Sequence, residues 1–331
     1  MKWYTPVDII PSVHKVDHTV PVMMMGSCFA ESIGEKLAGL KFEVDINPFG
    51  ILFNPSSIKL CIERLIKGQK FVKEELIEHN YLWHSMLHHS RFSSMEAETT
   101  LLNINERLAF SSSFLRKARF LFITFGTAWI YIYKKTGQVV ANCHKLPASV
   151  FERRLLSPED IVADYRKLIG EIKKINPAVQ IIFTVSPVRH LKDTAAGNNL
   201  SKSTLIVAVH RLCEEGLATY FPAYEIMLDE LRDYRFYADD AVHPSEAAVD
   251  YIFEKFSTAY FDEHTKSINK ALQEIQAGMS HKIEFPGHPS IRSFASGMLE
   301  RIHKLERDYP ALNFEKEKKY FEDLLHSIRQ K

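Results

Sequence analysis

An apolar run over residues 19–25 stops abruptly at Gly26-Ser27, and residues at helical spacing begin directly after it. The run fits a buried strand, and the pattern that follows, with Ile33 and Leu37 on one face, fits a helix. Gly26 permits a sharp turn between the two, and a helix N-terminus supplies free backbone N–H groups and a partial positive charge. The junction predicts a strand-turn-helix unit in which Ser27 is either a nucleophile or a plain helix N-cap.

The same unit recurs along the chain. Four more apolar runs are strand candidates, at residues 42–46, 119–124, 179–185 and 220–226. Helical patterns separate them, at residues 54–65, 96–117, 157–175 and 205–212, and a last one covers residues 245–260. This alternation predicts βαβ units, a parallel sheet and right-handed crossovers. Ligands of such sheets bind at the carboxyl ends of the strands, which is where Ser27 would lie.

Two regions fall outside this alternation. Residues 128–133 and 138–141 flank a Lys-Lys-Thr-Gly turn and predict a hairpin that returns the polar residues 142–145 toward the strand end. Residues 76–96 concentrate aromatic and imidazole groups without clear periodicity, so we predict a loop that covers other structure.

Length and composition fit an ordinary globular chain. Its 331 residues, 46% apolar and 25% charged, suffice for a sizeable core. From about residue 266 onward the pattern is charged, helical and free of strands. We predict one α/β domain over residues 1–265 and an appended helical extension over residues 266–331, which packs on the core or on a partner.

Charge and hydropathy exclude several classes of partner. The 42 basic residues balance 41 acidic ones, which leaves no basic footprint for nucleic acid or for an anionic membrane surface. No stretch approaches the ~20 apolar residues of a spanning helix, and residues 1–21 contain no apolar core of a secretion signal. Four cysteines without paired spacing favour reduced thiols. We expect a cytoplasmic protein with no nucleic-acid or membrane partner.

Asp240 and His243 stand three residues apart, directly before Pro244 and the last predicted helix. One short segment can place a carboxylate behind an imidazole, which is the arrangement of a general base and its orienting group. If this loop lies at the same sheet edge as Ser27, His243 takes the Ser27 proton and Asp240 stabilises the imidazolium. A surface loop or a helix cap is the alternative interpretation.

These segments resemble a known family. Residues 26–30 read Gly-Ser-Cys-Phe-Ala, the signature of the GSCFA family, and its further motifs are similar to residues 124–129, 142–145, 186–188 and 240–244. The likeness covers most of residues 1–265. The family is similar to the SGNH, or GDSL-like, hydrolases, whose fold is a flavodoxin-like three-layer α/β/α sandwich.

The resemblance implies an activity and a set of roles. Such hydrolases cleave acyl esters, often acetyl groups on carbohydrates, or transfer acyl groups, and they need no metal or organic cofactor. By resemblance Ser27 is the nucleophile, His243 the base and Asp240 its orienting group. The glycine of the second motif falls on Gly50, whose N–H would join that of Ser27 in the oxyanion hole.

The third motif departs from the pattern of the SGNH enzymes, which usually carry Gly-x-Asn-Asp there. Residues 126–129 read Gly-Thr-Ala-Trp, so the asparagine expected as a third oxyanion donor is missing. The amide of Asn142, returned by the hairpin, or the hydroxyl of Thr127 could replace it, and Asn142 is the preferred candidate. Otherwise residues 142–145 are simply a polar turn.

Several other side chains have two interpretations. Cys28 adjoins a helix N-terminus that could lower its thiol pKa, so a Cys28–His243 enzyme is an alternative. The imidazoles of His84, His88 and His89 could bind a metal, but no carboxylate or thiol accompanies them at ligand spacing. We therefore expect no metal, and take His84 and His88 as candidates for substrate contact or as structural histidines.

Three basic residues, Lys145, Arg189 and Lys202, are predicted on loops near strand ends. They could bind an anionic group of an acyl donor, with solvated surface as the alternative.

The sequence thus predicts a serine hydrolase that cleaves an acyl ester, for example an O-acetyl group on a carbohydrate or a glycan precursor, with no cofactor. An O-acyltransferase with the same triad is the first alternative, because a sugar hydroxyl can replace water. A ligand-binding or scaffolding protein that keeps the fold without turnover is the second. A small-molecule or carbohydrate ester is the expected partner.

Overall fold

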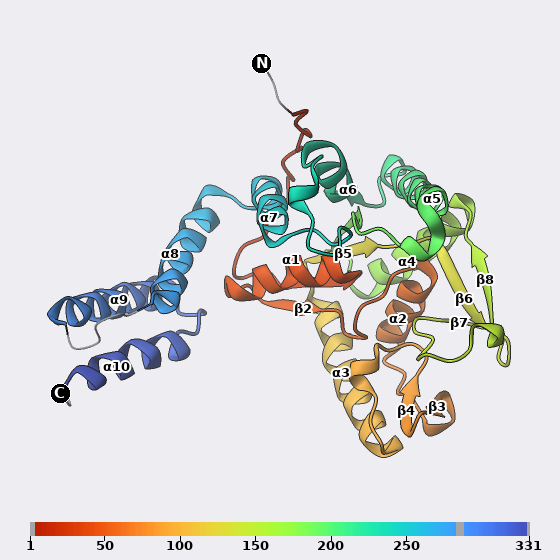
Figure 1. Cartoon of the computed structure of the whole chain (residues 1–331), viewed down its shortest axis with the longest axis horizontal. Coiled ribbons are helices and arrows are strands. Elements are labelled where there is room, and N and C mark those ends of the chain that lie inside the picture. The colour runs from red at the N-terminus through yellow and green to blue at the C-terminus, as the bar shows by residue number, and fades with distance from the viewer. Residues whose placement is uncertain (1–3, 283–287, 330–331) are drawn as a thin grey trace.

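The centre of the computed structural model, which describes residues 4–282 and 288–329, is a parallel sheet (Figure 1). Its five strands are β1 (Val22–Gly26), β2 (Val44–Ile46), β5 (Phe120–Phe125), β9 (Gln180–Val185) and β10 (Thr219–Tyr220), in the order β10-β9-β5-β1-β2. Every neighbouring pair is parallel. Numbered in chain order, the strands run 2-1-3-4-5, which is the flavodoxin-like order. The predicted parallel α/β sheet is confirmed.

Helices cover both faces of this sheet, because successive strand residues point to opposite faces and both sets are apolar. On one face Met24 belongs to an apolar cluster with α1 (Cys28–Gly39) and α7 (Glu246–Tyr260). On the other face Met25 belongs to a second cluster, built with α2 (Pro55–Lys67), α3 (Ala97–Lys117), α4 (Pro158–Ile175) and α5 (Thr194–Glu214). The result is the expected three-layer α/β/α arrangement.

Local sequence signals fix where several helices begin. The Ser157 hydroxyl accepts the Asp160 N–H and the Asp160 carboxylate accepts the Ser157 N–H, so a capping box starts α4. The Asn54 side chain accepts the Ser57 N–H at 2.8 Å and caps α2 in the same way. These caps satisfy backbone donors that would otherwise lack partners, and the predicted helix starts are confirmed.

Two small antiparallel sheets stand beside the main one. The predicted hairpin is confirmed as β6 (Trp129–Tyr133) and β7 (Gln138–Val140), and β8 (Phe151–Leu155) adds a third strand that the sequence did not predict. The prediction of a loop over residues 76–96 that covers other structure is wrong in part. That segment contains a second hairpin, formed by β3 (Leu76–His79) and β4 (Leu82–Ser85).

The last predicted strand, residues 220–226, is mostly wrong. Strand β10 ends at Tyr220, and a helical segment follows that comprises α6 (Ala223–Glu225) and a π-helical turn (Ile226–Glu230). Pro222 lies between them and has no backbone N–H with which to continue the ladder, so the strand stops there.

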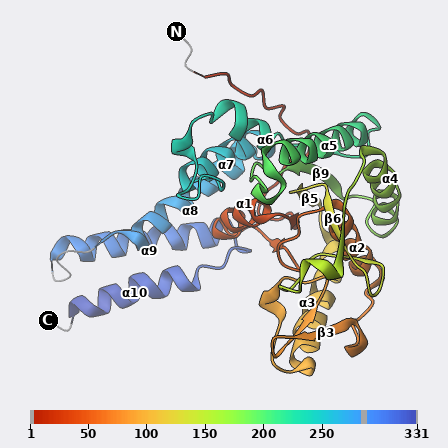
Figure 2. The same cartoon turned by 45° about the vertical axis from the view of Figure 1, so that its right-hand side comes forward.

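The C-terminal extension is helical, as predicted, and comprises α8 (Glu263–Ser280), α9 (Pro289–Asp308) and α10 (Glu315–Arg329). Helices α9 and α10 lie side by side and project away from the sheet (Figures 1 and 2). An ion pair of 2.8 Å between Lys41 and Glu317 ties α10 to the end of α1.

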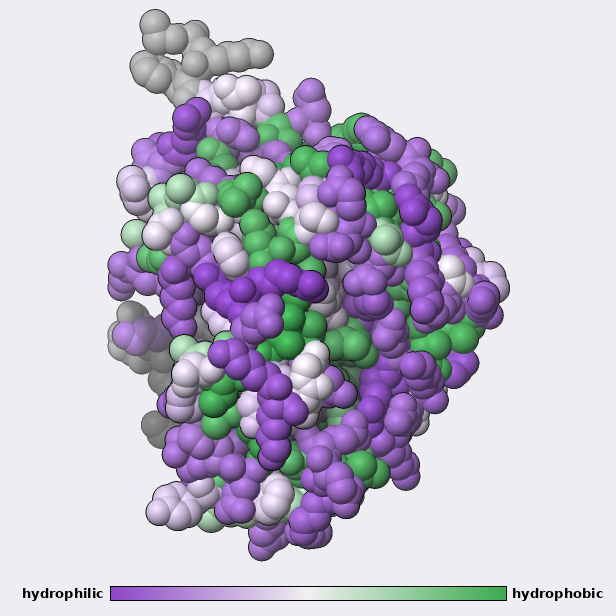
Figure 3. Space-filling view, turned by 90° about the vertical axis from the view of Figure 1, so that its right-hand side faces the viewer, coloured by the Kyte–Doolittle hydropathy of each residue, from purple (hydrophilic) through white to green (hydrophobic). Residues whose placement is uncertain are grey.

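The surface is mixed in character. Hydrophilic residues dominate the face shown in Figure 3, and apolar residues form groups near its middle. Within residues 4–282 and 288–329, none of the helices combines the length and the apolar character that are needed to cross a bilayer.

Candidate active site

The carboxyl edge of the sheet between β1 and β5 is a topological switch point, because β1 pairs with β2 on one side and β5 on the other. Open α/β sheets bind ligands at such a point. Ser27 follows β1 directly, and Gly126 follows β5. The fold therefore places the sequence-predicted serine where a ligand is expected.

Ser27 occupies the N-cap position of α1, but its side chain makes no capping hydrogen bond. The residue is 1% exposed, and its Oγ has no hydrogen-bond partner among the described residues. Buried polar atoms normally have partners, and an isolated one calls for an explanation. A hydroxyl held free at a helix N-terminus can attack a bound electrophile, because the helix dipole favours the negative charge that develops there.

Gly26 makes this position of Ser27 attainable. Its φ is +135°, a backbone conformation that side chains rarely permit, and a Cβ at Gly26 would lie 2.1 Å from the Thr124 carbonyl oxygen. The strand end therefore passes close to β5, and the Ser27 N–H donates to that same oxygen at 3.2 Å. Only glycine fits at this turn.

Asp240 and His243 form the predicted pair. Asp240 Oδ2 lies 2.6 Å from His243 Nδ1, and Asp240 Oδ1 accepts the backbone N–H groups of Val242 and His243, each at 2.9 Å. These hydrogen bonds, led by the His243 backbone N–H, lower the pKa of Asp240 to about 2. Because a carboxylate only accepts, His243 Nδ1 carries the proton and Nε2 is left as a base.

The loop that carries this pair lies beside α1. A β-bridge between Tyr237 and Pro244 closes the loop, and Pro244 lines one cavity together with Ser32 of α1. Ser32 is one helical turn from Cys28, whose carbonyl oxygen accepts its hydroxyl at 3.1 Å. His243 is not hydrogen-bonded to Ser27 in this structure, because Ser27 Oγ has no partner among the described residues. Catalytic hydrogen bonds often tighten only when substrate binds.

His190 lies at the same carboxyl edge of the sheet, beside the turn that follows β5. A Cβ at Gly126 would lie 3.2 Å from His190 Nε2, so the imidazole stands against the turn after β5. Burial, together with the electrostatic effects of Lys202, Arg153 and His243, lowers the pKa of His190 to about 4.

The oxyanion donors that the sequence analysis named have other partners. The Gly50 N–H donates to the Asn47 carbonyl oxygen at 2.7 Å within its own turn, and the Ser27 N–H is bonded to Thr124. Asn142 accepts the His144 N–H with its side chain at 2.9 Å, and its own N–H donates to Met86 at 3.1 Å. Asn142 thus closes a polar turn, which was the alternative interpretation, and no contact described for it reaches Ser27.

Asn47 is the residue that the sequence analysis missed. Its Oδ1 accepts the Gly26 N–H at 2.8 Å, and its Nδ2 is buried without a partner among the described residues. The amide of Asn47, with its unused N–H₂ group, is therefore bonded to Gly26, the residue before Ser27. The turn-rich sequence at residues 47–50 was the available signal, but it was interpreted only as a loop.

Lys202 does not lie on a surface loop. It is buried in α5, and its Nζ donates to the carbonyl oxygens of Gly126 and Ser186, each at 2.6 Å. Burial lowers the pKa of its ammonium group to about 7. Because both acceptors follow strand ends, Lys202 holds the turns after β5 and β9 together instead of binding an anion at the surface.

For His84 and His88 the structure favours the second of their two interpretations, that of structural histidines. Both rings are buried: His84 is bonded to the Ser93 hydroxyl at 2.6 Å, and the Nδ1 of His88 is bonded to the Ser85 hydroxyl at 2.8 Å. Burial keeps His88 neutral, since it lowers the pKa to about 3. These histidines support the segment around β4, so their burial argues against direct contact with a substrate.

The other three candidates for substrate binding, Thr127, Lys145 and Arg189, lie in different surroundings. Thr127 is buried, and its hydroxyl is 3.0 Å from that of Ser201, which ties it to α5. Lys145 is exposed in the turn after the hairpin. Arg189 is exposed on the loop after β9, and its charge acts on Tyr237, at the start of the loop that carries Asp240 and His243. Of these three, Arg189 is the one linked to that loop.

Cys28 is a poor competitor for the role of nucleophile. Burial raises the pKa of its thiol, so the reactive thiolate is disfavoured. Across residues 4–282 and 288–329, no group of three His, Cys, Asp or Glu side chains is placed to hold a metal ion.

Comparison with known proteins identifies relatives. The model of the GSCFA family matches residues 21–256, and that of the GSCFA domain protein, C-terminal domain, matches residues 272–327. Among solved structures, the chain is similar to a Clostridium thermocellum family 3 carbohydrate esterase, with 12% sequence identity and a TM-score of 0.29, over 76% of this chain and 96% of that chain. No curated protein matches.

Proposed function

The chain belongs to the GSCFA family, and we propose that it is a serine hydrolase that cleaves acyl esters through Ser27, His243 and Asp240. One observation carries the proposal: the 2.6 Å hydrogen bond between Asp240 and His243, in a loop beside the helix that begins at a buried, unpartnered Ser27 hydroxyl. A nucleophile, a base and an orienting group are the three parts that acyl transfer through serine needs.

The first half of the reaction forms an acyl-enzyme. His243 Nε2 takes the Ser27 proton while Ser27 Oγ attacks the ester carbonyl carbon, and the carbonyl oxygen becomes an oxyanion. The tetrahedral intermediate collapses, the bond to the alcohol oxygen breaks, and His243 returns the proton to the leaving alcohol. The pKa of Asp240 is lowered to about 2, so its carboxylate is ionised at neutral pH. It stabilises the imidazolium throughout this half-reaction.

The second half releases the acid. Water attacks the acyl carbon while His243 removes one of its protons, and collapse of the second intermediate returns that proton to Ser27. An alcohol in place of water would give transfer instead of hydrolysis. The same residues therefore serve both outcomes, and the difference lies in what occupies the space beside His243.

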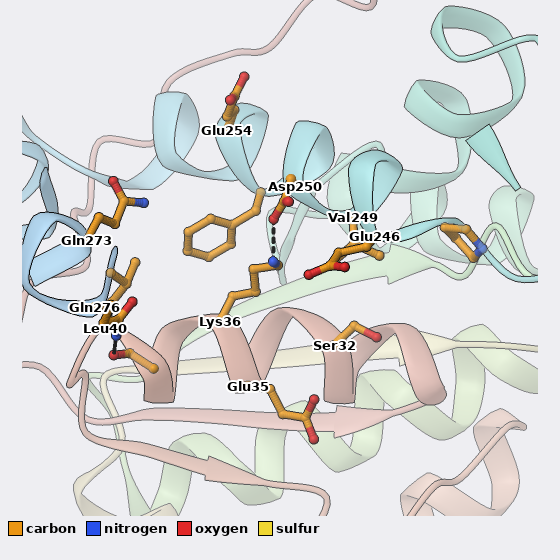
Figure 4. A pocket seen from close by; sticks show the side chains of 13 residues that line it. Ser32, Glu35, Lys36, Leu40, Glu246, Val249, Asp250, Glu254, Gln273 and Gln276 are labelled. Atoms are coloured by element: carbon orange, nitrogen blue, oxygen red, sulfur yellow. Dashed lines mark hydrogen bonds and ion pairs between the residues drawn. The ribbon is translucent and has the colours of Figure 1, made fainter. Parts of the chain in front are cut away.

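A polar cavity adjoins the loop that carries His243, although Ser27, Asp240 and His243 do not themselves line it. It has a volume of about 710 Å³ and lies between α1, α7 and α8 (Figure 4). Pro244, the residue after His243, is one of the residues that line it. Lys36 and Asp250 form an ion pair across it, and Gln273 lines its far end (Figure 4). Amide and carboxylate groups can hydrogen-bond sugar hydroxyls, which supports a carbohydrate O-ester as the substrate.

The proposal is tested with p-nitrophenyl acetate and with acetylated sugars. We expect the wild-type protein to release acetate, and the Ser27→Ala variant to lose this activity. Cys28→Ala is the matched control at the neighbouring position and is expected to keep most of it. Addition of free sugars then separates hydrolysis from transfer, because transfer produces an acetylated acceptor. Equal hydrolysis by wild type and Ser27→Ala would contradict the proposed nucleophile.

A further inference from the structure

We propose that the side-chain amide of Asn47 is the oxyanion donor of this site, taking the place of the asparagine that the third motif lacks. The inference rests on the proposed function, because it assigns a role within acyl transfer at Ser27. It is a separate claim about which group stabilises the negative charge, and none of the sequence-predicted donors included Asn47.

The orientation of the amide is fixed by its partner. The Gly26 backbone N–H is a donor, so the Asn47 atom 2.8 Å away must be the oxygen, Oδ1. Nδ2 belongs to the same planar amide group and therefore lies one amide width from the atom that binds the Gly26 N–H. It is buried and has no acceptor among the described residues. A buried N–H₂ group without an acceptor lowers the stability of the fold, because its lost hydrogen bonds to water are not replaced. An oxyanion bound beside it would accept its hydrogen bond.

The backbone of Asn47 is held on several sides. Its N–H donates to the Met24 carbonyl oxygen at 2.9 Å, which extends the pairing of β2 with β1. Its own carbonyl oxygen accepts the Gly50 N–H at 2.7 Å and the Arg91 guanidinium at 3.0 Å. Arg91 in turn pairs with Glu31 of α1 at 3.1 Å. The amide is thus preorganised, which is what makes an oxyanion donor effective.

The left-handed backbone conformation of Asn47 also helps to fix the position of its amide. Asn47 has φ +42°, a conformation that asparagine tolerates better than most residues. This bend turns the chain out of β2 so that the side chain reaches back across to β1. Asparagine therefore suits this position for two reasons: it tolerates the left-handed bend, and its side chain carries the amide.

The backbone N–H groups of Ser27, Gly50 and Ala128 already have acceptors. The Ser27 N–H is bonded to Thr124 and the Gly50 N–H to Asn47, while the Ala128 N–H, in the third motif, donates to the Ser201 hydroxyl at 2.7 Å. Ser27 Oγ and Asn47 Nδ2 are both buried without a partner among the described residues, as is Thr124 Oγ1 on β5. Ser27 follows Gly26 in the chain, and the Asn47 amide is bonded to Gly26 through Oδ1. The inference requires that, when Ser27 bonds to an acyl carbon, the carbonyl oxygen of that carbon comes within reach of the amide.

The kinetic test uses Asn47→Asp, which keeps an oxygen for the Gly26 N–H and removes the N–H₂ donor. Loss of one oxyanion donor typically lowers kcat by about 10²–10³, and we expect a loss of that size with little change in KM. Asn54→Asp is the matched control, because Asn54 also binds a backbone N–H through Oδ1 but caps α2 instead of adjoining Gly26. A kcat for Asn47→Asp within a few-fold of wild type would overturn the inference.

A second test uses the wild-type protein and does not depend on how a variant folds. An alkyl fluorophosphonate reacts at phosphorus: the bond to Ser27 Oγ forms, the bond to fluorine breaks, fluoride leaves and His243 takes the serine proton. The phosphonyl oxygen then stands in for the oxyanion. In a crystal structure of this adduct we expect that oxygen about 2.7–3.1 Å from Asn47 Nδ2.

The outcomes of this second test separate the two claims. An adduct on Ser27 whose phosphonyl oxygen is bound by other groups overturns the role of Asn47 and leaves the proposed nucleophile standing. Failure of the wild-type protein to form any adduct at Ser27 contradicts the proposed function, and the role of Asn47 falls with it.

Discussion

Asp240 holds His243 through both of its oxygens: Oδ2 lies 2.6 Å from the ring Nδ1, and Oδ1 accepts the His243 backbone N–H at 2.9 Å. The carboxylate therefore fixes the ring and the loop together. Because it only accepts hydrogen bonds, it selects the tautomer in which Nε2 is free to act as a base.

Asp240→Asn is expected to lower kcat for ester hydrolysis by about 10²–10⁴, because an amide can donate to Nδ1 and so favour the wrong tautomer. KM should change little, since neither group is assigned to substrate binding. Steady-state kinetics with p-nitrophenyl acetate measure both constants. Asp239→Asn, at the exposed neighbouring residue, is the control. Activity of Asp240→Asn within three-fold of wild type would remove Asp240 from the mechanism.

Gly26→Ala is expected to destabilise the fold by roughly 2–4 kcal/mol, because alanine is strained at φ +135° and its Cβ would meet a backbone oxygen at 2.1 Å. Urea unfolding measures the loss. Gly170→Ala is the control with the opposite sign: Gly170 lies inside α4 with open space around it, so alanine should add about 0.5–1 kcal/mol. Equal stabilities for the two variants would contradict the account of the turn.

His88 is expected to make the protein sensitive to acid. Its pKa is lowered from 6.5 to about 3 by burial, so between these values the unfolded chain binds a proton that the folded chain does not. Stability is therefore lost as the pH falls below about 6.5, by about 2 kcal/mol at pH 5. Urea midpoints at pH 7 and pH 5 measure this loss, and His88→Asn, which keeps a polar group near Ser85, should lose less. Parallel pH profiles for the two proteins would disprove the assignment.

Lys202 is expected to make the stability of the protein depend on pH in a different, alkaline range. Its pKa is lowered from 10.5 to about 7 by burial, so the unfolded chain binds one more proton than the folded chain between these values. The free energy of unfolding therefore rises by about 2 kcal/mol from pH 7 to pH 9 through the titration of Lys202. The Lys202→Met variant should lack this rise in urea unfolding.

The variant Lys135→Met, at an exposed turn residue, is the control for that experiment and should keep the rise. A wild-type stability that does not change relative to Lys202→Met across this range would show that Lys202 is not a buried titrating group.

The sequence predicted the main sheet because its strands are buried on both faces and read as continuous apolar runs that end at turn residues. It failed at β8, where residues 152–154 are charged and exposed, since an edge strand outside the core carries no apolar run. It failed again after Tyr220, where apolar residues continue but Pro222 ends the ladder. Apolar character alone does not distinguish a strand from a buried helix.

In the candidate site, the serine and the Asp-x-x-His pair were predictable because each depends on residues close together in the sequence. The proposed oxyanion donor was not, because it depends on a hydrogen bond between Asn47 and Gly26, 21 positions apart. Lys202 was misplaced for a related reason. A lysine is usually exposed, and only the carbonyl oxygens of two strand ends explain its burial.

The measurement that tests the central claim most directly is peptide mapping of the fluorophosphonate adduct by mass spectrometry. We expect wild type to gain one phosphonyl group on Ser27, Ser27→Ala to gain none, and His243→Ala to react at least 100-fold more slowly. A label that persists in Ser27→Ala, or that maps to Cys28, would contradict the proposal that Ser27 is the nucleophile.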